Sequence, residues 1–298
     1  MGRATACRSE PGVLSASPGL PADLESSVAR ALAEDVGSGD LTAALVPAGT
    51  RCRARVITRE AAVLCGAAFA DAVFRQLDPQ VRLRWHAVDG EQLAAGALLF
   101  EAQGPARALL TGERTALNFL QTLSGTATTV HRYVEAIAGT GCAILDTRKT
   151  IPGLRLAQKY AVRCGGGHNH RIGLYDGILV KENHIAAAGS IGAAVAAARA
   201  LGTAVPVEVE VETLAELEQA FAAGADLALL DDFTLAELRE AVARNRARSR
   251  PLRLEASGGV SLQTIREVAA TGVDYVSVGA LTKHVRAIDL SMRCELGG

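Results

Sequence analysis

The sequence predicts an α/β protein of two domains. Its 298 residues exceed the usual size of a single domain. Hydrophobic residues make up 49% of the chain but aromatic residues only 4%, and the apolar content is mostly Ala, Leu and Val. That composition suits helices packed closely on a parallel sheet better than a β-sandwich. In the second half of the chain, short apolar runs alternate with amphipathic helical stretches, which is typical of βαβ units.

The first part of the chain predicts a layer of helices on an antiparallel sheet. A helix is expected from Pro21 to the turn at Gly37–Asp40, because apolar residues recur there at helical spacing. Apolar and polar residues then alternate over 52–56 and 81–87, which predicts two strands, and a helix is expected between them over 66–77.

The second part predicts parallel strands separated by helices. It begins with a helical pattern from Pro105 to about Ala138, with a break expected at Ser124-Gly125. The predicted strands are Cys142–Asp146, Ile178–Lys181, Pro206–Val211, Leu227–Asp231, Leu252–Ala256 and Tyr275–Val278. The predicted helices between them are Ser190–Leu201, Leu214–Ala223, Leu235–Arg246 and Leu262–Ala270. A closed barrel needs eight strands, so this count leaves both a barrel-like and a doubly wound sheet open.

Polar side chains suited to chemistry gather at the carboxyl ends of these strands. In parallel α/β folds this is the edge where ligands bind. Successive strands end at or are followed by such groups: Asp146 to Lys149, Lys181, Glu210, Asp231, Ser257 to Gly259, and Gly279. Their common position favours a barrel-like arrangement with a ligand site at one rim.

Positive side chains are concentrated between Asp146 and His184, near the Gly-rich loop 165–167. Lys181 ends an otherwise apolar strand, and a buried cation needs an anionic partner. That partner is either a carboxylate of the protein or an anionic ligand, and the local excess of positive charge favours the ligand. A second group, Arg155, Lys159 and Arg163, has helical spacing and is interpreted as a solvated helix face.

Three further features of the rim each have a structural and a functional interpretation. His168, Asn169, His170 and His184 form a possible metal site, which is disfavoured because nearby cations repel a dication. The loops at Ser257–Gly259 and Gly279-Ala280 are either turns or a phosphate site made of backbone amides, and the phosphate site is favoured. Glu210 and Asp231 either pair with arginines or hold ribose hydroxyls or Mg²⁺.

The charge balance excludes some classes of partner. Lys and Arg total 31 and Asp and Glu total 32, so no overall field attracts nucleic acid or a membrane surface. The six cysteines contain no CxxC pair and are interpreted as reduced thiols. Residues 1–20 lack the apolar core of a secretion signal. We therefore expect a cytoplasmic enzyme with a flexible tail over residues 1–20.

Several motifs together resemble one family from about residue 21 to the end. They are EDVGSGDLT, GERTALNFLQTLSGTAT, LDTRKTIPGLR, KYAVRCGGGHNHRIGLYDGILVKENHI, VEVEVET, LLDDF, EASGGV and GVDYVSVGALTKH. In this order they resemble quinolinate phosphoribosyltransferases, the nicotinate-nucleotide pyrophosphorylases. The resemblance implies an N-terminal α/β sandwich domain over 21–116, joined by 285–298. It also implies an incomplete, open α/β barrel of six or seven strands over 117–284.

The resemblance also implies a reaction and its residues. Quinolinate and phosphoribosyl pyrophosphate, with Mg²⁺, would give nicotinate mononucleotide, CO2 and pyrophosphate in NAD biosynthesis. Lys149, Lys181, Glu210 and Asp231 are the implied catalytic residues, the two carboxylates contacting the ribose and metal side. Implied quinolinate contacts are Thr147, Arg148, Lys149, His170, Arg171 and Lys181, with Arg114 from the second subunit of a homodimer. The 5-phosphate would lie on Ser257, Gly258, Gly259, Ser277, Val278, Gly279 and Ala280.

One position departs from the family pattern, and two other functions stay open. LLDDF places Asp232 where the family is expected to have Asn, which puts the rate in doubt more than the identity. One alternative is a related phosphoribosyltransferase acting on another pyridine acid such as nicotinate. The other is a non-catalytic relative that binds phosphorylated metabolites.

Overall fold

The structure, a computed structural model, describes residues 19–296 and divides into two compact units. The sandwich unit comprises residues 19–135, 149–167 and 279–296, and the barrel unit comprises residues 136–148 and 168–278. The tail expected over residues 1–20 lies almost wholly outside the described residues.

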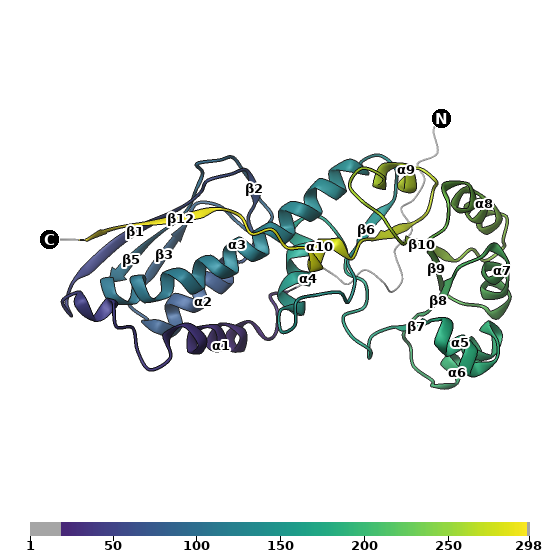
Figure 1. Ribbon diagram of the computed structural model, residues 1–298, viewed down its shortest axis with the longest axis horizontal. Coiled ribbons are helices and arrows are strands. Elements are labelled where there is room, and N and C mark those ends of the chain that lie inside the picture. Colours follow the sequence, from purple (N-terminus) through teal and green to yellow (C-terminus); the bar gives the residue numbers. More distant parts are fainter. Residues whose placement is uncertain (1–18, 297–298) are drawn as a thin grey trace, which may run out of the picture. The chain divides into compact units, whose positions relative to one another are not determined.

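The sandwich unit packs helices on an antiparallel sheet (Figure 1). Its elements are α1 (Leu24–Val36), η1 (Ala43–Leu45), β1 (Arg51–Thr58), β2 (Ala62–Val63), α2 (Ala67–Leu77), β3 (Arg82–Trp85), β4 (Gln92–Leu93), β5 (Leu98–Pro105), α3 (Ala106–Ala136), α4 (Arg155–Cys164), α10 (Ala280–Lys283) and β12 (Leu290–Leu296). The main sheet has the order β12-β1-β5-β3. Along β1, exposed and buried residues alternate, as the sequence predicts for a strand with one solvated face. The strand β12 pairs with β1, so the last described segment completes this sheet.

Helix α3 runs unbroken for 31 residues, so the predicted break at Ser124-Gly125 is wrong. Both residues serve packing instead. The Ser124 hydroxyl accepts a hydrogen bond from the amide of Cys65 (2.9 Å) and donates one to its carbonyl (3.2 Å). A Cβ at Gly125 would lie 2.2 Å from the carbonyl oxygen of Arg286, so only glycine fits there. The domain limits implied by the resemblance stay a prediction, and α3 passes through residue 116 without interruption.

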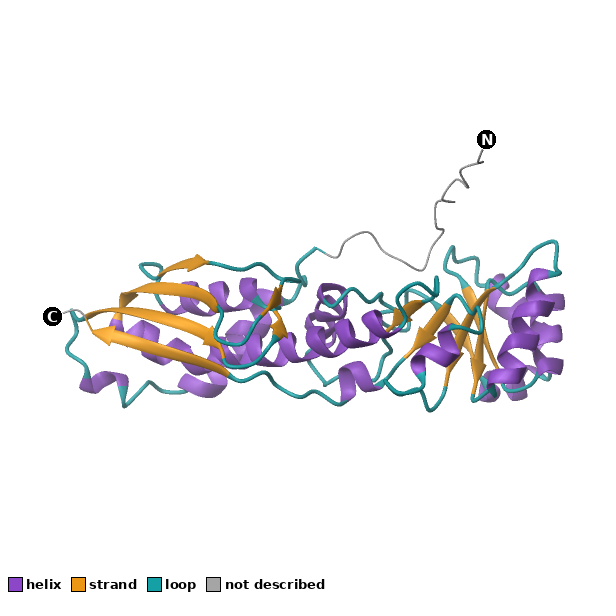
Figure 2. Ribbon diagram, turned by 90° about the horizontal axis from the view of Figure 1, so that it is seen from above, coloured by secondary structure: helices purple, strands orange, loops and turns teal. Residues whose placement is uncertain are grey.

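The barrel unit contains six parallel strands in the order β6-β11-β10-β9-β8-β7. Its elements are β6 (Ala143–Leu145), β7 (Ile178–Val180), α5 (Glu182–Ala188), α6 (Ile191–Ala200), β8 (Val207–Val211), α7 (Leu214–Ala223), β9 (Leu227–Asp231), α8 (Leu235–Arg246), β10 (Arg253–Ser257), α9 (Ile265–Ala269) and β11 (Tyr275–Ser277). Figure 2 shows the helices lying along the outer side of these strands. The six strands and the four helices predicted between them are confirmed.

The sheet of the barrel unit is open. From β7 to β11 each strand neighbours the next one in the chain, with no reversal of order, so the sheet is barrel-like rather than doubly wound. The described strands β6 and β7 do not pair with each other, and an isolated bridge between Leu145 and His168 extends the β6 edge by one residue. The open α/β barrel implied by the resemblance is confirmed. Within residues 19–296, no helix is long and apolar enough to cross a membrane.

Candidate active site

Because the strands of the barrel unit are parallel, their carboxyl ends lie at one edge of the sheet. Residues 146–148 follow β6 and Lys181 follows β7, while Ser257 pairs in register with Asp231. The barrel unit therefore contains these predicted site residues: Thr147, Arg148, His170, Arg171, Lys181, Glu210, Asp231, Ser257, Gly258, Gly259, Ser277 and Val278. The remaining four, Arg114, Lys149, Gly279 and Ala280, belong to the sandwich unit.

Two guanidinium groups approach each other at this edge. The side chain of Arg171 is half-buried, and its Nη1 donates to the carbonyl of Gly177 at 3.0 Å. Burial lowers the pKa of Arg171, and the positive charge of Arg148 lowers it further, while Glu208 and Asp176 act in the opposite direction. Loss of solvent and repulsion between like charges both favour an anion at this point. Arg171, with Arg148 near it, is therefore a favourable place for an anion.

A tight loop after Arg171 holds that side chain in place. The Asp176 carboxylate accepts hydrogen bonds from the amides of Ile172 (2.7 Å) and Gly173 (2.9 Å). A Cβ at Gly177 would lie 3.2 Å from the Cβ of Arg171, so the loop packs closely against the arginine. The loop 172–177 thus constrains the side chain of Arg171, while the amide of Arg171 donates to His170.

Lys181 forms an ion pair with Glu210, its Nζ donating to the Oε2 of the carboxylate. The Glu210 side chain is only 12% exposed, so the pair is partly shielded from water. The carboxylate that the sequence left as one of two possible partners of Lys181 is therefore present, and contact of this lysine with an anionic ligand stays a prediction. The sequence could not decide between them, because the meeting of β7 with β8 depends on strand order.

His170 is held at both ring nitrogens. Its Nδ1 accepts a hydrogen bond from the amide of Arg171 (2.8 Å), and its Nε2 lies 2.8 Å from an oxygen of Glu208. The same Nε2 lies 3.4 Å from an oxygen of Glu255. The backbone amide of His170 donates to the fully buried carboxylate of Asp146 (2.9 Å), which ties this segment to the end of β6.

Glu208 and Glu255 were not predicted as site residues. They lie within the apolar strand sequences VEVEV and LEA, and no motif or strand-end position marks them as functional. The usable signal was the strand period: Glu208 is two residues from Glu210, so both side chains face the same side of the sheet. A carboxylate inside a buried apolar strand is a second signal, because burying it without a partner is costly.

The predicted phosphate loop has a strained backbone that only small or adaptable residues allow. Gly258 has φ +95° and Gly259 has φ +56°. A Cβ at Gly258 would lie 2.0 Å from the carboxylate Oδ1 of Asp232. Asp232 itself, at φ 54°, is the one non-glycine residue with positive φ in the described part of the chain. Both Asp and Asn tolerate this conformation, so Asp232 in place of the Asn expected for the family preserves the turn.

In the sandwich unit, a buried hydrogen-bond chain fixes the backbone of Lys149. The backbone carbonyl of Lys149 accepts a hydrogen bond from the hydroxyl of Thr282 (2.9 Å). The backbone carbonyl of Thr282 in turn accepts one from the side-chain amide of Gln158 (2.7 Å). Gln158 and Thr282 are fully buried. Arg114, on α3, is exposed.

The interpretation of α4 as a helix with a solvated cationic face is wrong for Lys159, which is 3% exposed. The buried residues of this helix, Ala157, Gln158, Lys159, Ala161 and Val162, cover most of its circumference. Helical spacing alone does not reveal that both sides of a helix are covered.

The described residues contain two groups whose atoms lie close enough to hold a metal ion. They are His170 with Glu208 and Glu255, and Cys65 with Asp89 and Cys164. The candidate metal ligands from the sequence, apart from His170, are in neither group. The Asp89 carboxylate already accepts from Gly66 (3.1 Å), Ala67 (3.1 Å) and Tyr160 (2.8 Å), so it has little capacity left for a metal.

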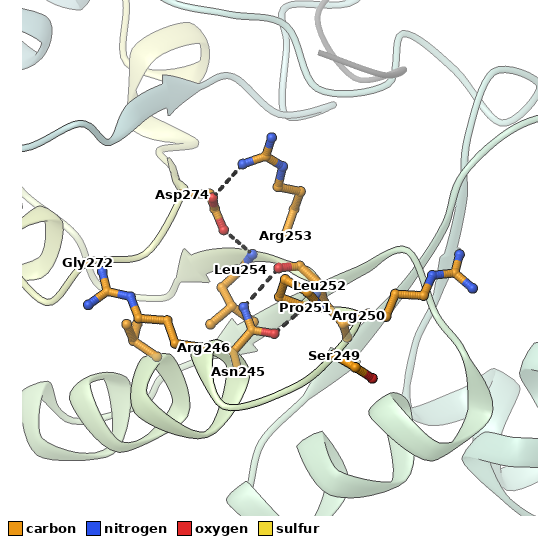
Figure 3. Close-up of a pocket in the computed structure, with 11 residues that line it drawn as sticks. Asn245, Arg246, Ser249, Arg250, Pro251, Leu252, Arg253, Leu254, Gly272 and Asp274 are labelled. Atoms are coloured by element: carbon orange, nitrogen blue, oxygen red, sulfur yellow. Dashed lines mark hydrogen bonds and ion pairs between the residues drawn. The ribbon is translucent and has the colours of Figure 1, made fainter. Parts of the chain in front are cut away.

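A cavity of about 650 Å³ lies at the opposite edge of the barrel unit, near the amino ends of β10 and β11. Figure 3 shows Arg253 pointing to Asp274, whose other oxygen accepts from the amide of Leu254. Arg253 and Asp274 are thus engaged in holding strands together. Ligand chemistry in such folds occurs at the carboxyl ends, so we do not assign the active site here.

Cationic side chains and a glycine loop therefore meet at the carboxyl ends of the strands of an open α/β barrel, an arrangement that suits the binding of anionic ligands by an enzyme of this fold class. The family models for quinolinate phosphoribosyl transferase match nearly the whole chain, the N-terminal domain over residues 40–124 and the C-terminal domain over residues 126–293. The chain therefore belongs to the quinolinate phosphoribosyltransferase family, as the sequence motifs indicated.

Individual relatives agree with this assignment. The chain is 44% identical to a probable nicotinate-nucleotide pyrophosphorylase (carboxylating) of Bacillus subtilis, over 88% of this chain and 90% of that protein. It is also 44% identical to the nicotinate-nucleotide pyrophosphorylase (carboxylating) of Mycobacterium leprae, over 89% and 95% respectively. The solved structure of the Francisella tularensis nicotinate-nucleotide pyrophosphorylase is similar, with TM-score 0.90, 48% identity and coverage of 94% and 98%. The chain is thus a phosphoribosyltransferase.

Proposed function

We propose that this chain transfers the phosphoribosyl group of phosphoribosyl pyrophosphate to quinolinate and releases CO2, giving nicotinate mononucleotide and pyrophosphate. One observation carries the proposal: Arg148 follows β6, Arg171 lies half-buried in the same unit, and burial together with the charge of Arg148 lowers the pKa of Arg171. Quinolinate carries two carboxylates on neighbouring ring carbons, which match two planar guanidinium forks.

The other residues take roles that suit their chemistry. Thr147 and Lys149 flank Arg148 in the chain and extend the cationic pocket. Lys181, which follows β7 and pairs with Glu210, completes the cationic pocket for the quinolinate carboxylates. Glu210 and Asp231 contact the ribose and metal side. The loops 257–259 and 277–280 bind the 5-phosphate through backbone amides. His170, whose ring nitrogens are both engaged by the protein, acts on the pocket through Arg171.

The reaction needs alignment and charge stabilisation rather than a nucleophilic residue. The pyridine nitrogen forms a bond to ribose C1 while the pyrophosphate leaves with the bonding electron pair. The ring nitrogen is then positively charged. When the bond to the 2-carboxylate breaks, CO2 departs and the electron pair stays on the ring carbon, stabilised by that charge. A proton then adds to the carbon.

We propose that Mg²⁺ enters with phosphoribosyl pyrophosphate. The two three-residue groups of potential ligands in the described chain do not include Glu210 or Asp231. We therefore propose that the ion takes most of its ligands from phosphate oxygens and water. When bound, the ion would neutralise charge on the leaving pyrophosphate.

We further propose a cytoplasmic homodimer in which Arg114 reaches the active site of the partner subunit. Its exposed place on α3 is compatible with that role. The reduced cysteines and balanced charge of the chain support the location.

The test is an incubation of the purified protein with quinolinate, phosphoribosyl pyrophosphate and Mg²⁺. We expect CO2 and nicotinate mononucleotide in equal amounts. Nicotinate in place of quinolinate should be a poor substrate, because it leaves one guanidinium without a carboxylate. Faster turnover of nicotinate would favour the related transferase, and ligand binding without CO2 release would favour the non-catalytic relative.

A further inference from the structure

A pair of buried acids lies behind the cationic pocket. Glu208 on β8 and Glu255 on β10 are 5% and 1% exposed. The imidazole of His170 lies against both, with its Nε2 at 2.8 Å from Glu208 and 3.4 Å from Glu255. The oxygens of the two acids and this nitrogen all lie within 4.8 Å of one another.

The two acids cannot both be ionised without leaving buried oxygens unsatisfied. Among residues 19–296, no donor makes a hydrogen bond of good geometry to either oxygen of Glu255 or to Oε1 of Glu208. Two carboxylates only accept hydrogen bonds, so they repel each other at this distance. A proton on one of them supplies a donor for the other and removes one buried charge.

The contacts of His170 decide which acid holds the proton. The Nδ1 of its ring accepts from the amide of Arg171, so Nδ1 carries no hydrogen. The ring proton is therefore on Nε2 and is donated to Glu208, so Glu208 already has a hydrogen-bond donor whereas Glu255 does not. Glu255 is left as the neutral acid.

The surroundings of Glu255 agree with this assignment. Burial is the main cause that raises the pKa of Glu255, to about 8, and the charge of Glu208 adds to it, while His170 and Ser277 oppose the shift. Its register neighbours in the sheet are Leu229 on β9 and Tyr275 on β11, neither of which is a cation.

We propose that Glu255 is a positioning residue: as a neutral acid it donates a hydrogen bond to Glu208, and the pair orients His170, which fixes the backbone of Arg171. The pair then carries one negative charge instead of two behind Arg148 and Arg171, so the pocket keeps a positive excess for a substrate with two carboxylates. This inference rests on the proposed function, because it concerns the binding of quinolinate.

The experiment compares Glu255→Gln with Glu255→Leu. Glutamine is neutral at every pH and its amide donates to Glu208, whereas leucine leaves Glu208 without that donor. We expect Glu255→Leu to raise KM for quinolinate by roughly ten- to a hundredfold, the range for one unsatisfied buried group. KM for phosphoribosyl pyrophosphate should change little. Gln should restore KM to within about threefold of wild type. Glu218→Gln, on the surface of α7, is the matched control.

Two further readouts separate positioning from mere structure. Above pH of about 8, ionisation of Glu255 should raise KM for quinolinate in wild type, and this rise should be missing in Glu255→Gln. At neutral pH, the infrared spectrum of wild type should contain a carboxylic-acid carbonyl band that Glu255→Gln lacks.

Each outcome is decisive. Equal impairment of the Gln and Leu variants, or no such infrared band, would overturn the proposal, because the acid would then act as an anion. A divalent metal that co-purifies with wild type and is lost in Glu255→Gln would overturn it in favour of a metal site. If wild type forms no nicotinate mononucleotide but the infrared band is present, the proposed function fails and the protonation of Glu255 stands.

Discussion

Replacing Arg171 by methionine should remove substrate binding while leaving the fold intact. The side chain is half-buried beside Arg148, and its pKa is lowered chiefly by that burial. A base whose pKa is lower in the folded than in the unfolded protein is ionised at the expense of folding stability. The charged form of Arg171 therefore lowers the folding stability of the free enzyme, and a bound carboxylate would offset that cost.

The expected magnitudes follow from these contacts. Removing one partner of a desolvated charge pair costs about 2–5 kcal/mol of binding. That corresponds to a fall of roughly 30- to 5000-fold in kcat/KM for quinolinate. The free enzyme loses the hydrogen bond from Nη1 to Gly177 (3.0 Å), at a cost of about 1 kcal/mol. Relief of the desolvated charge offsets that loss, so the midpoint of thermal unfolding should move by about 3 °C or less.

The assays are steady-state kinetics with quinolinate varied at saturating phosphoribosyl pyrophosphate, and thermal unfolding without ligands. Arg199→Met on α6 is the control, because Arg199 pairs with Asp226 (2.8 Å) away from the candidate site. Its kcat/KM should stay within about twofold of wild type. Arg171→Lys, which keeps the charge but not the planar fork, should fall between wild type and Met. An unchanged KM for quinolinate in Arg171→Met, or a loss of activity matched by loss of folded protein, would refute the reasoning.

Three other substitutions test separate parts of the site. Arg114→Ala and Lys181→Ala chains, each inactive alone, should regain about a quarter of wild-type activity when mixed. Half of randomly formed dimers are hybrids, and one of the two sites in each hybrid is intact. If activity does not return after verified subunit exchange, Arg114 does not act across the interface. Gly258→Ala should destabilise the protein by about 1–3 kcal/mol in thermal unfolding, because its Cβ meets Asp232 at φ +95°, and Gly259→Ala, which has open space, should cost less. Asp232→Asn should lower KM for phosphoribosyl pyrophosphate by about fivefold, because removing a negative charge near phosphate contributes on the order of 1 kcal/mol to binding. The stability of the protein should not change. An unchanged KM would show that this carboxylate does not face the phosphates.

Local pattern was enough to predict much of the fold. The limits of β9, α7 and α8 coincide with those read from the sequence, because strand and helix periods and turn residues act over a few neighbouring positions. The placement of polar residues at the carboxyl ends of strands was likewise visible, since a parallel sheet puts all those ends at one edge. The family itself followed from the order of the motifs.

The features that sequence reasoning misjudged depend on contacts between distant segments. Helix α3 continues through Ser124-Gly125 because Cys65 and Arg286 pack against those residues. Lys159 has the spacing of a surface charge and is nevertheless 3% exposed.

The sequence by itself determined the six strands and four helices of the barrel unit and the set of charged residues at the strand ends, and its motifs implied the open barrel. Only the tertiary structure decided which charges meet: Glu210 neutralises Lys181, while Glu208 and Glu255 enclose the ring of His170. The reason is physical. Helix and strand formation depend on nearest neighbours in the chain, whereas electrostatic partners are chosen by strand order and register, which no local pattern contains.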